Sequence, residues 1–157
     1  MCVCRMLAED GDDEGWMVVS SLFFTKPRME GAKSVERWTS RKAINVFEKK
    51  LILVPIHRQR HWSLCVVVNP GNVLRGRQCG DDGDGWSGME ACLWLFDSAR
   101  CHNPKNVRKA MQGWLNREWQ QGGKEREKEE PFTNETCKLL EPSGEWFVGL
   151  LSINGCS

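Results

Sequence analysis

Two histidines and an aspartate, each beside an apolar run, are the residues of this sequence best suited to acid–base chemistry. The stretch LILVPIHRQRHWSL at 51–64 contains an apolar run ending in His57 and a pair, His61-Trp62, that opens the next run. A third apolar run, CLWLF, leads directly into Asp97. A histidine oriented by an aspartate is two thirds of a nucleophilic triad, in which the histidine activates a thiol or hydroxyl. The sequence therefore predicts a base and its orienting carboxylate, and leaves the nucleophile to be found.

Three predicted strands would position these side chains. Residues 51–56, 62–68 and 92–97 are short apolar runs, as buried strands are. The almost unbroken apolarity of 51–56 predicts that both of its faces are buried. Successive strands joined by a loop pair antiparallel, so the start of one lies beside the end of the next. This pairing would place His61 near Asp97.

A helix after the third strand is predicted from its capping residues. Asn103 would cap it, Pro104 would occupy its first turn, and Gly122-Gly123 would end it after about Gln120. The remaining predictions are a strand or buried helix at 16–24, short helices at 34–38 and 41–47, a turn at 69–71, a Gly- and Asp-rich loop at 71–90, a solvated linker at 124–130 and a fourth strand at 145–151. Residues 1–15 are predicted to be disordered or peripheral, and 16–157 to form one domain.

Composition limits the class of protein. The 157 residues are 40% hydrophobic and 27% charged, as in a single globular domain, and the net charge of +1 gives no reason to expect a nucleic-acid partner. The apolar runs are too short to span a membrane, and the acidic start of the chain does not resemble a signal peptide. We therefore expect neither nucleic acid nor a membrane as a partner.

The eight cysteines indicate reduced thiols rather than a disulfide framework. Cys65 and Cys92 lie within apolar strands, where cysteine behaves as a small hydrophobic residue, and the chain has no CxxC pair. A zinc site built from Cys79, Cys92, Cys101 and His102 would have poor ligand spacing. We expect no metal and no other cofactor.

These motifs occur together in a known family, the SUMO-specific (sentrin-specific) ubiquitin-like-protein cysteine proteases, which the sequence resembles from about residue 17 to 157. The resemblance is carried by SSLFFTK at 20–26, by VERWTSRKAINVFEKKLILVPIHRQRHWSL at 35–64 and by LWLFDSA at 93–99. It implies an α+β, papain-like fold of the ULP type, incomplete at the C-terminus and at the N-terminus. It also implies a Cys-His-Asp triad that cleaves after the C-terminal Gly-Gly of SUMO or another ubiquitin-like modifier.

The resemblance implies a role for each matching residue. His61 would be the general base and Asp97 would fix its tautomer and orientation. Trp62, with Trp38 of the same block, would bind the substrate's Gly-Gly in a slot that admits residues without a Cβ. Ordinary core packing is the alternative for Trp62, and a structural role is expected for His57.

The nucleophile is where the chain departs from the family pattern. The family motif reads Gln-x-Asn-x-x-Asp-Cys-Gly, whereas this chain ends in SINGCS. Aligning Asn154-Gly155 with the motif puts Ser152 at the oxyanion glutamine and Ser157 at the aspartate. The cysteine would then fall one residue past Ser157, so we expect a chain truncated before its nucleophile. Cys156 is the alternative nucleophile in a shifted register.

Two functions follow from these observations. The first is a cysteine peptidase that processes or deconjugates SUMO or a related modifier inside the cell, in the nucleus or cytoplasm. The second is a catalytically inactive binder of a ubiquitin-like protein, because the nucleophile is missing or displaced.

Overall fold

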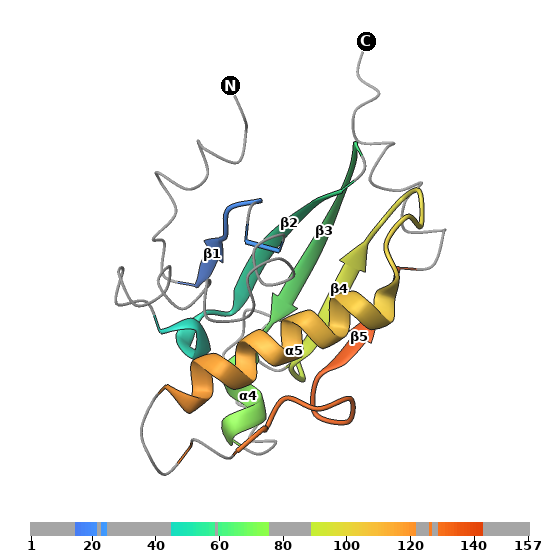
Figure 1. The fold of residues 1–157 in the computed structure, drawn as a ribbon. Helices are drawn as coiled ribbons and strands as arrows, with labels where there is room; N and C mark the ends of the chain where they lie inside the picture. The colour runs from blue at the N-terminus through green and yellow to red at the C-terminus, as the bar shows by residue number, and fades with distance from the viewer. Residues whose placement is uncertain are drawn as a thin grey trace.

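A computed structural model describes residues 15–21, 23–24, 45–58, 60–75, 89–121, 126 and 129–142. Within these residues one mixed sheet has the strand order β1-β2-β3-β4-β5 (Figure 1). The strands are β1 (Trp16–Val18), β2 (Leu51–Arg58), β3 (His61–Val68), β4 (Cys92–Phe96) and β5 (Lys138–Leu140). The helices are η1, a 3-10 turn at Val46–Glu48, α4 (Pro70–Arg75) and α5 (Pro104–Gln120).

The central three strands form an antiparallel meander that confirms the predicted pairing. Strands β2 and β3 are paired along their full length, and Arg58 lies opposite His61 across the hairpin turn. Strand β4 pairs antiparallel with β3, with Phe96 opposite Leu64. His61 begins β3 and Asp97 directly follows β4, so both residues lie at the same end of the sheet. The outer strands β1 and β5 pair parallel with β2 and β4.

One face of the sheet carries the core and is covered by α5, which lies across it (Figure 1). Alternate strand residues on this face are completely buried, as the two-residue period of a strand requires; they are Ile52, Val54 and Ile56 on β2, Cys65 and Val67 on β3, and Leu93 on β4. The residues between them, Leu51, Leu53, Leu64 and Val66, are only partly buried. The prediction that both faces of 51–56 are buried therefore holds for Ile52 and for 54–56, and Leu51 and Leu53 are buried only in part.

Helix α5 begins where the Asn103-Pro104 pair predicted, and it ends at Gln120 as expected. The Asn103 side chain accepts a hydrogen bond from the Lys105 backbone N–H at 2.9 Å, and Pro104 occupies the first turn. Its buried stripe consists of Val107, Met111, Trp114 and Leu115, which face the sheet. The ring of Phe23 meets Trp114 edge to face at 4.7 Å between centroids.

Two buried amides of α5 fix the segment that leads to β5. The Asn116 side chain exchanges two hydrogen bonds with the Phe132 backbone, at 2.8 and 3.1 Å. The Gln112 side chain donates to the carbonyls of Thr133 and Cys137, at 2.8 and 3.0 Å. Both amides thus satisfy backbone groups of the segment 132–137, which precedes β5.

Several local predictions needed correction. The predicted loop at 71–90 is wrong at its start, because α4 runs over Pro70–Arg75, with proline at the helix start and Asn69 before it at a φ of 42°. Among the described residues of the 16–24 run, Trp16–Val18 alone form a strand, and the described end of 41–47 is the 3-10 turn η1. Strand β5 was not predicted. The predictions for 34–38, 145–151 and nearly all of 1–15 lie outside the described residues. No helix in the described ranges is long and apolar enough to cross a membrane.

Candidate active site

The predicted base and its orienting carboxylate are in direct contact. His61 Nε2 lies 2.6 Å from Asp97 Oδ1, at the end of the sheet where β3 begins and β4 ends. The Asp97 side chain is 6% exposed and the His61 side chain is 20% exposed. The pair is therefore shielded on the carboxylate side, while part of the imidazole remains open to a reacting group.

The second oxygen of Asp97 is held by the chain that leads into α5. Asp97 Oδ2 accepts the backbone N–H of His102 at 2.7 Å, and His102 Nδ1 lies 3.2 Å from the same oxygen. Burial by itself would raise the pKa of Asp97, but hydrogen bonds from the His102 backbone, the His61 and His102 rings and the Cys101 backbone outweigh it and lower that pKa below its ordinary value. Asp97 is thus held as a carboxylate.

This contact decides which nitrogen of His61 can do chemistry. Facing a carboxylate oxygen at 2.6 Å, Nε2 must carry a proton, so Nδ1 of the neutral ring is left as the acceptor. An imidazole in this state can take a proton from a thiol and become an imidazolium, whose charge Asp97 stabilises. The geometry is that of a base and its orienter.

Trp62 is a surface residue. Its side chain is 48% exposed, and its ring lies 4.5 Å from the ring of His57, its partner across the hairpin, with an interplanar angle of 30°. The core-packing alternative for Trp62 is therefore wrong. His57 supports Trp62 and, in the hydrogen bonds of the described residues, has no contact with Asp97.

The thiols of the described residues are free, and three of them are buried. Burial raises the pKa of Cys65 and of Cys137 to about 12, and it also raises that of Cys92. Such thiols stay protonated and are poor nucleophiles. Cys101 is exposed, and it follows β4 at the end opposite to Cys92, so these two members of the candidate zinc set lie apart.

Within the described ranges, one group of side chains has the spacing of metal ligands: His61, Asp97 and His102, whose ligand atoms all lie within 4.8 Å of one another. The contacts of Asp97 with the two histidines have the distances of hydrogen bonds. In each of them a ring N–H can donate to a carboxylate oxygen. The group is accounted for without an ion.

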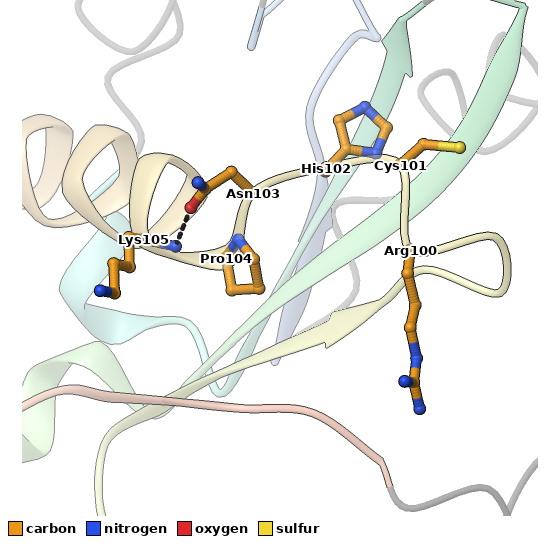
Figure 2. Close-up of a pocket in the computed structure, with 6 residues that line it drawn as sticks. All are labelled: Arg100, Cys101, His102, Asn103, Pro104 and Lys105. Carbon is orange, nitrogen blue, oxygen red and sulfur yellow. Dashed lines mark hydrogen bonds between the residues drawn. The ribbon is translucent and has the colours of Figure 1, made fainter.

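The sequence analysis did not identify His102, which contacts Asp97, or Ser63, which contacts His102, as parts of this site. His102 lies in the segment 100–105 between β4 and α5, where its ring and the Arg100 side chain point to opposite sides (Figure 2). That segment lines a shallow pocket, and a cavity of about 200 Å³ lies beside Asp97 and His102 and is lined also by Arg100 and Glu141. The sequence did contain one signal for His102: it directly precedes the helix cap Asn103 and is close in sequence to Asp97. The predicted residues Trp38, Ser152 and Cys156 lie outside the described residues.

Comparison with known proteins identifies the family of this chain. The family model described as "Ulp1 protease family, C-terminal catalytic domain" matches residues 4–141. The chain therefore belongs to the Ulp1 protease family.

Individual relatives match shorter parts of the chain. Sentrin-specific protease 2 of Homo sapiens is 43% identical over 66 residues, which are 40% of this chain and 11% of that protein. Sentrin-specific protease 3 of Homo sapiens is 46% identical over 48 residues, which are 31% of this chain and 8% of that protein. The chain thus spans about a tenth of the length of these relatives.

Solved structures confirm the fold. A de-sumoylating protease superposes with a TM-score of 0.63 at 17% identity, covering 89% of this chain and 48% of that one. The catalytic domain of an Ulp1-like SUMO protease from Chaetomium thermophilum gives a TM-score of 0.52 at 17% identity, covering 96% of this chain and 52% of that one. The predicted α+β fold of the ULP type is therefore correct.

Proposed function

We propose that this chain supplies the catalytic domain of a cysteine peptidase that cleaves after the C-terminal Gly-Gly of SUMO or another ubiquitin-like modifier. The observation that carries this proposal is the 2.6 Å contact between His61 Nε2 and Asp97 Oδ1, in a chain of the Ulp1 protease family. The modifier is inferred from the sentrin-specific and de-sumoylating proteases that the chain resembles.

In the proposed reaction, His61 Nδ1 takes the proton of a cysteine thiol, and the thiolate attacks the carbonyl carbon of the modifier's last glycine. The tetrahedral intermediate collapses by breaking the C–N bond, and the His61 imidazolium gives its proton to the leaving amine. Water, deprotonated by the same ring, then hydrolyses the thioester and restores the free thiol. Asp97 stays ionised throughout and stabilises the imidazolium.

Within this chain, Cys156 is the nucleophile we propose in the shifted register, as the alternative to a cysteine one residue past Ser157. Among the thiols of the described residues, Cys65, Cys92 and Cys137 are weaker candidates, because they are buried with raised pKa values. In the other register, in which Asn154-Gly155 match the motif and the cysteine falls one residue past Ser157, Ser152 aligns with the family's oxyanion glutamine and would donate its hydroxyl to the developing oxyanion. Since serine reaches less far than glutamine, and losing one such donor costs about a hundred- to a thousand-fold in rate, we expect slow turnover.

Trp62 and Trp38 are the residues we propose for binding the Gly-Gly tail. The support for Trp62 is its half-exposed ring, which stands next to His61 in sequence and is backed by the His57 ring. An aromatic wall beside the base would admit a chain without Cβ atoms close to the reacting carbonyl. Trp38 rests on the family resemblance alone.

The second candidate is a binder that holds a ubiquitin-like protein without cutting it. The observation that favours it is the sequence SINGCS, in which serines stand where the family motif has glutamine and aspartate. A binder would keep the Trp62 surface and would have no use for the buried, charged Asp97 beside His61. The presence of this pair in the structure therefore supports the peptidase.

Hydrolysis of SUMO carrying a fluorogenic amide on its C-terminal glycine tests this proposal. We expect the chain to release the fluorophore, His61→Ala to lower kcat by about a hundred- to ten-thousand-fold, and Cys156→Ala to abolish turnover. Lys109→Ala, at an exposed position on α5, is the matched control and should leave the rate unchanged. Equal rates for His61→Ala and the wild type would contradict the proposal. Tight binding of SUMO without turnover would instead identify the binder.

For the cellular location we propose the nucleus or the cytoplasm. The support comes from Cys65 and Cys137, which pack in the core as free thiols, as is usual for proteins of a reducing compartment. Imaging of the fluorescently tagged full-length protein tests this assignment, and a secreted protein would contradict it.

A further inference from the structure

A second histidine holds the carboxylate that orients His61. Asp97 divides its two oxygens between two imidazoles: Oδ1 contacts His61 at 2.6 Å, and Oδ2 contacts the ring of His102 at 3.2 Å. The two rings lie 5.8 Å apart between centroids and are inclined by 34°. The side chain of His102 is only 3% exposed, so its ring is fixed by packing as well as by hydrogen bonds.

His102 is tied in turn to the strand that carries His61. Its Nδ1 lies 3.0 Å from the hydroxyl oxygen of Ser63, a buried residue two positions after His61 on β3. Residues two apart on a strand point to the same face. The contacts therefore close a ring that starts at His61, passes through Asp97 and His102, and returns to β3 at Ser63.

The surroundings of His102 decide where its proton lies. If Nδ1 were unprotonated, its lone pair would face the Asp97 carboxylate, and the proton on Nε2 would be a buried donor. Within the described residues Nε2 is buried and has no hydrogen-bond partner. Both features cost free energy, so the proton is on Nδ1, where Asp97 Oδ2 and Ser63 Oγ share it.

We propose that His102 is a positioning residue, which acts through Asp97 to keep Oδ1 on the Nε2–H of His61. Without the His102 ring, Oδ2 would keep only backbone donors from the turn after β4, and the carboxylate could rotate away from His61. The other charged side chains beside this cluster, Arg100 and Glu141, line the neighbouring cavity and have no hydrogen bond to Asp97 among those found in the described residues. The inference deepens the proposed function, because it gives His102 a role in orienting the proposed base.

The test is proton NMR of the 157-residue chain labelled with nitrogen-15, at a pH where both imidazoles are neutral. A short hydrogen bond to a carboxylate should give the His61 Nε2–H a downfield resonance that exchanges slowly with water. His102→Leu removes the ring donor, and we expect exchange about tenfold faster, with the resonance moved upfield. His102→Asn can place an amide N–H near the former Nδ1 position and should restore slow exchange.

The outcomes separate this role from simple packing. Unchanged exchange in His102→Leu would overturn the proposal, as would a folded His102→Asn that exchanges as fast as His102→Leu. Should neither variant fold, Ser63→Ala decides: it frees the His102 ring from β3 and should speed exchange by a smaller factor, and no change would overturn the proposal. The resonance requires no nucleophile, so a chain with this signal but no SUMO hydrolysis would sink the proposed function and leave the role of His102 standing.

Discussion

His61 Nε2 lies 2.6 Å from Asp97 Oδ1 although 36 positions separate the two residues in the sequence. The contact exists because β3 and β4 pair antiparallel with Phe96 opposite Leu64, which brings the first residue of β3 beside the residue that follows β4. The pair lies at the end of the sheet, next to the strand residues that form the buried core. Such a base can be oriented before any substrate arrives.

The loss of folding stability at acid pH should depend on Asp97. Its pKa in the folded chain lies below the ordinary 3.8, because the hydrogen bonds from His102 and His61 outweigh burial. The charged carboxylate thus stabilises the folded state above about pH 4, and this contribution is lost as the pH falls through the lower, folded-state pKa. Urea unfolding between about pH 5 and pH 2 should show a shallower loss of stability for Asp97→Asn than for the wild type. Parallel curves would contradict the account.

Two tryptophans should respond differently to truncation. Trp62 is 48% exposed, so Trp62→Ala should cost less than about 2 kcal/mol in the free energy of unfolding, while raising KM for SUMO substrates. Trp114 is 4% exposed and packs on Phe23, so Trp114→Ala, the matched control, should cost about 3–5 kcal/mol. Urea denaturation and steady-state kinetics measure both. A Trp62→Ala as destabilised as Trp114→Ala would place Trp62 in the core and contradict the account.

Two helical glycines should have opposite effects when replaced by alanine. A Cβ on Gly71 of α4 would collide with the Phe47 carbonyl oxygen, whereas a Cβ on Gly113 of α5 would meet nothing within 4 Å. Gly71→Ala should therefore destabilise the fold by more than about 1 kcal/mol. Gly113→Ala should stabilise it by about 0.5–1 kcal/mol through helix propensity. Thermal unfolding of the two variants checks this, and a stabilised Gly71→Ala would show that Gly71 does not lie against the Phe47 carbonyl.

Thiol reactivity should follow burial. With pKa values of about 12 and no exposed surface, Cys65 and Cys137 should resist iodoacetamide in the folded chain and react only after unfolding. Cys101, which is exposed, should react in the native state. Peptide mapping by mass spectrometry reports each site separately. Rapid native labelling of Cys65 or Cys137 would contradict the assignment of these thiols to the core.

Much of this fold was predictable because strong local signals agree with the final structure. The apolar runs of β2, β3 and β4 and the Asn103-Pro104 start of α5 each specify an element, and strand order then places His61 beside Asp97. Strand β5 was missed because Lys138–Leu140 is too short for an alternating pattern, and amides of α5 hold the segment before it. Helix α4 was missed because Pro70-Gly71 also suits a turn.

The role of His102 could not be predicted, since it depends on how the turn after Asp97 folds back. The backbone N–H and the ring of His102 both reach Asp97 Oδ2, which a sequence pattern does not indicate. Arg100 adopts a φ of 50° in that turn, a conformation that favours glycine. Because the residue is an arginine, the residue type did not indicate a turn at this position. Geometry of this kind is set by tertiary packing.

The most direct test of the central claim, that His61 held by Asp97 activates a cysteine, uses SUMO bearing a C-terminal vinyl sulfone. This electrophile forms a thioether with a thiolate positioned at the site, without any turnover. The account predicts an adduct in the wild-type chain, mapped by mass spectrometry to Cys156, and its loss in both His61→Ala and Cys156→Ala, with Lys109→Ala reacting normally. An adduct that forms equally well in His61→Ala would contradict the account.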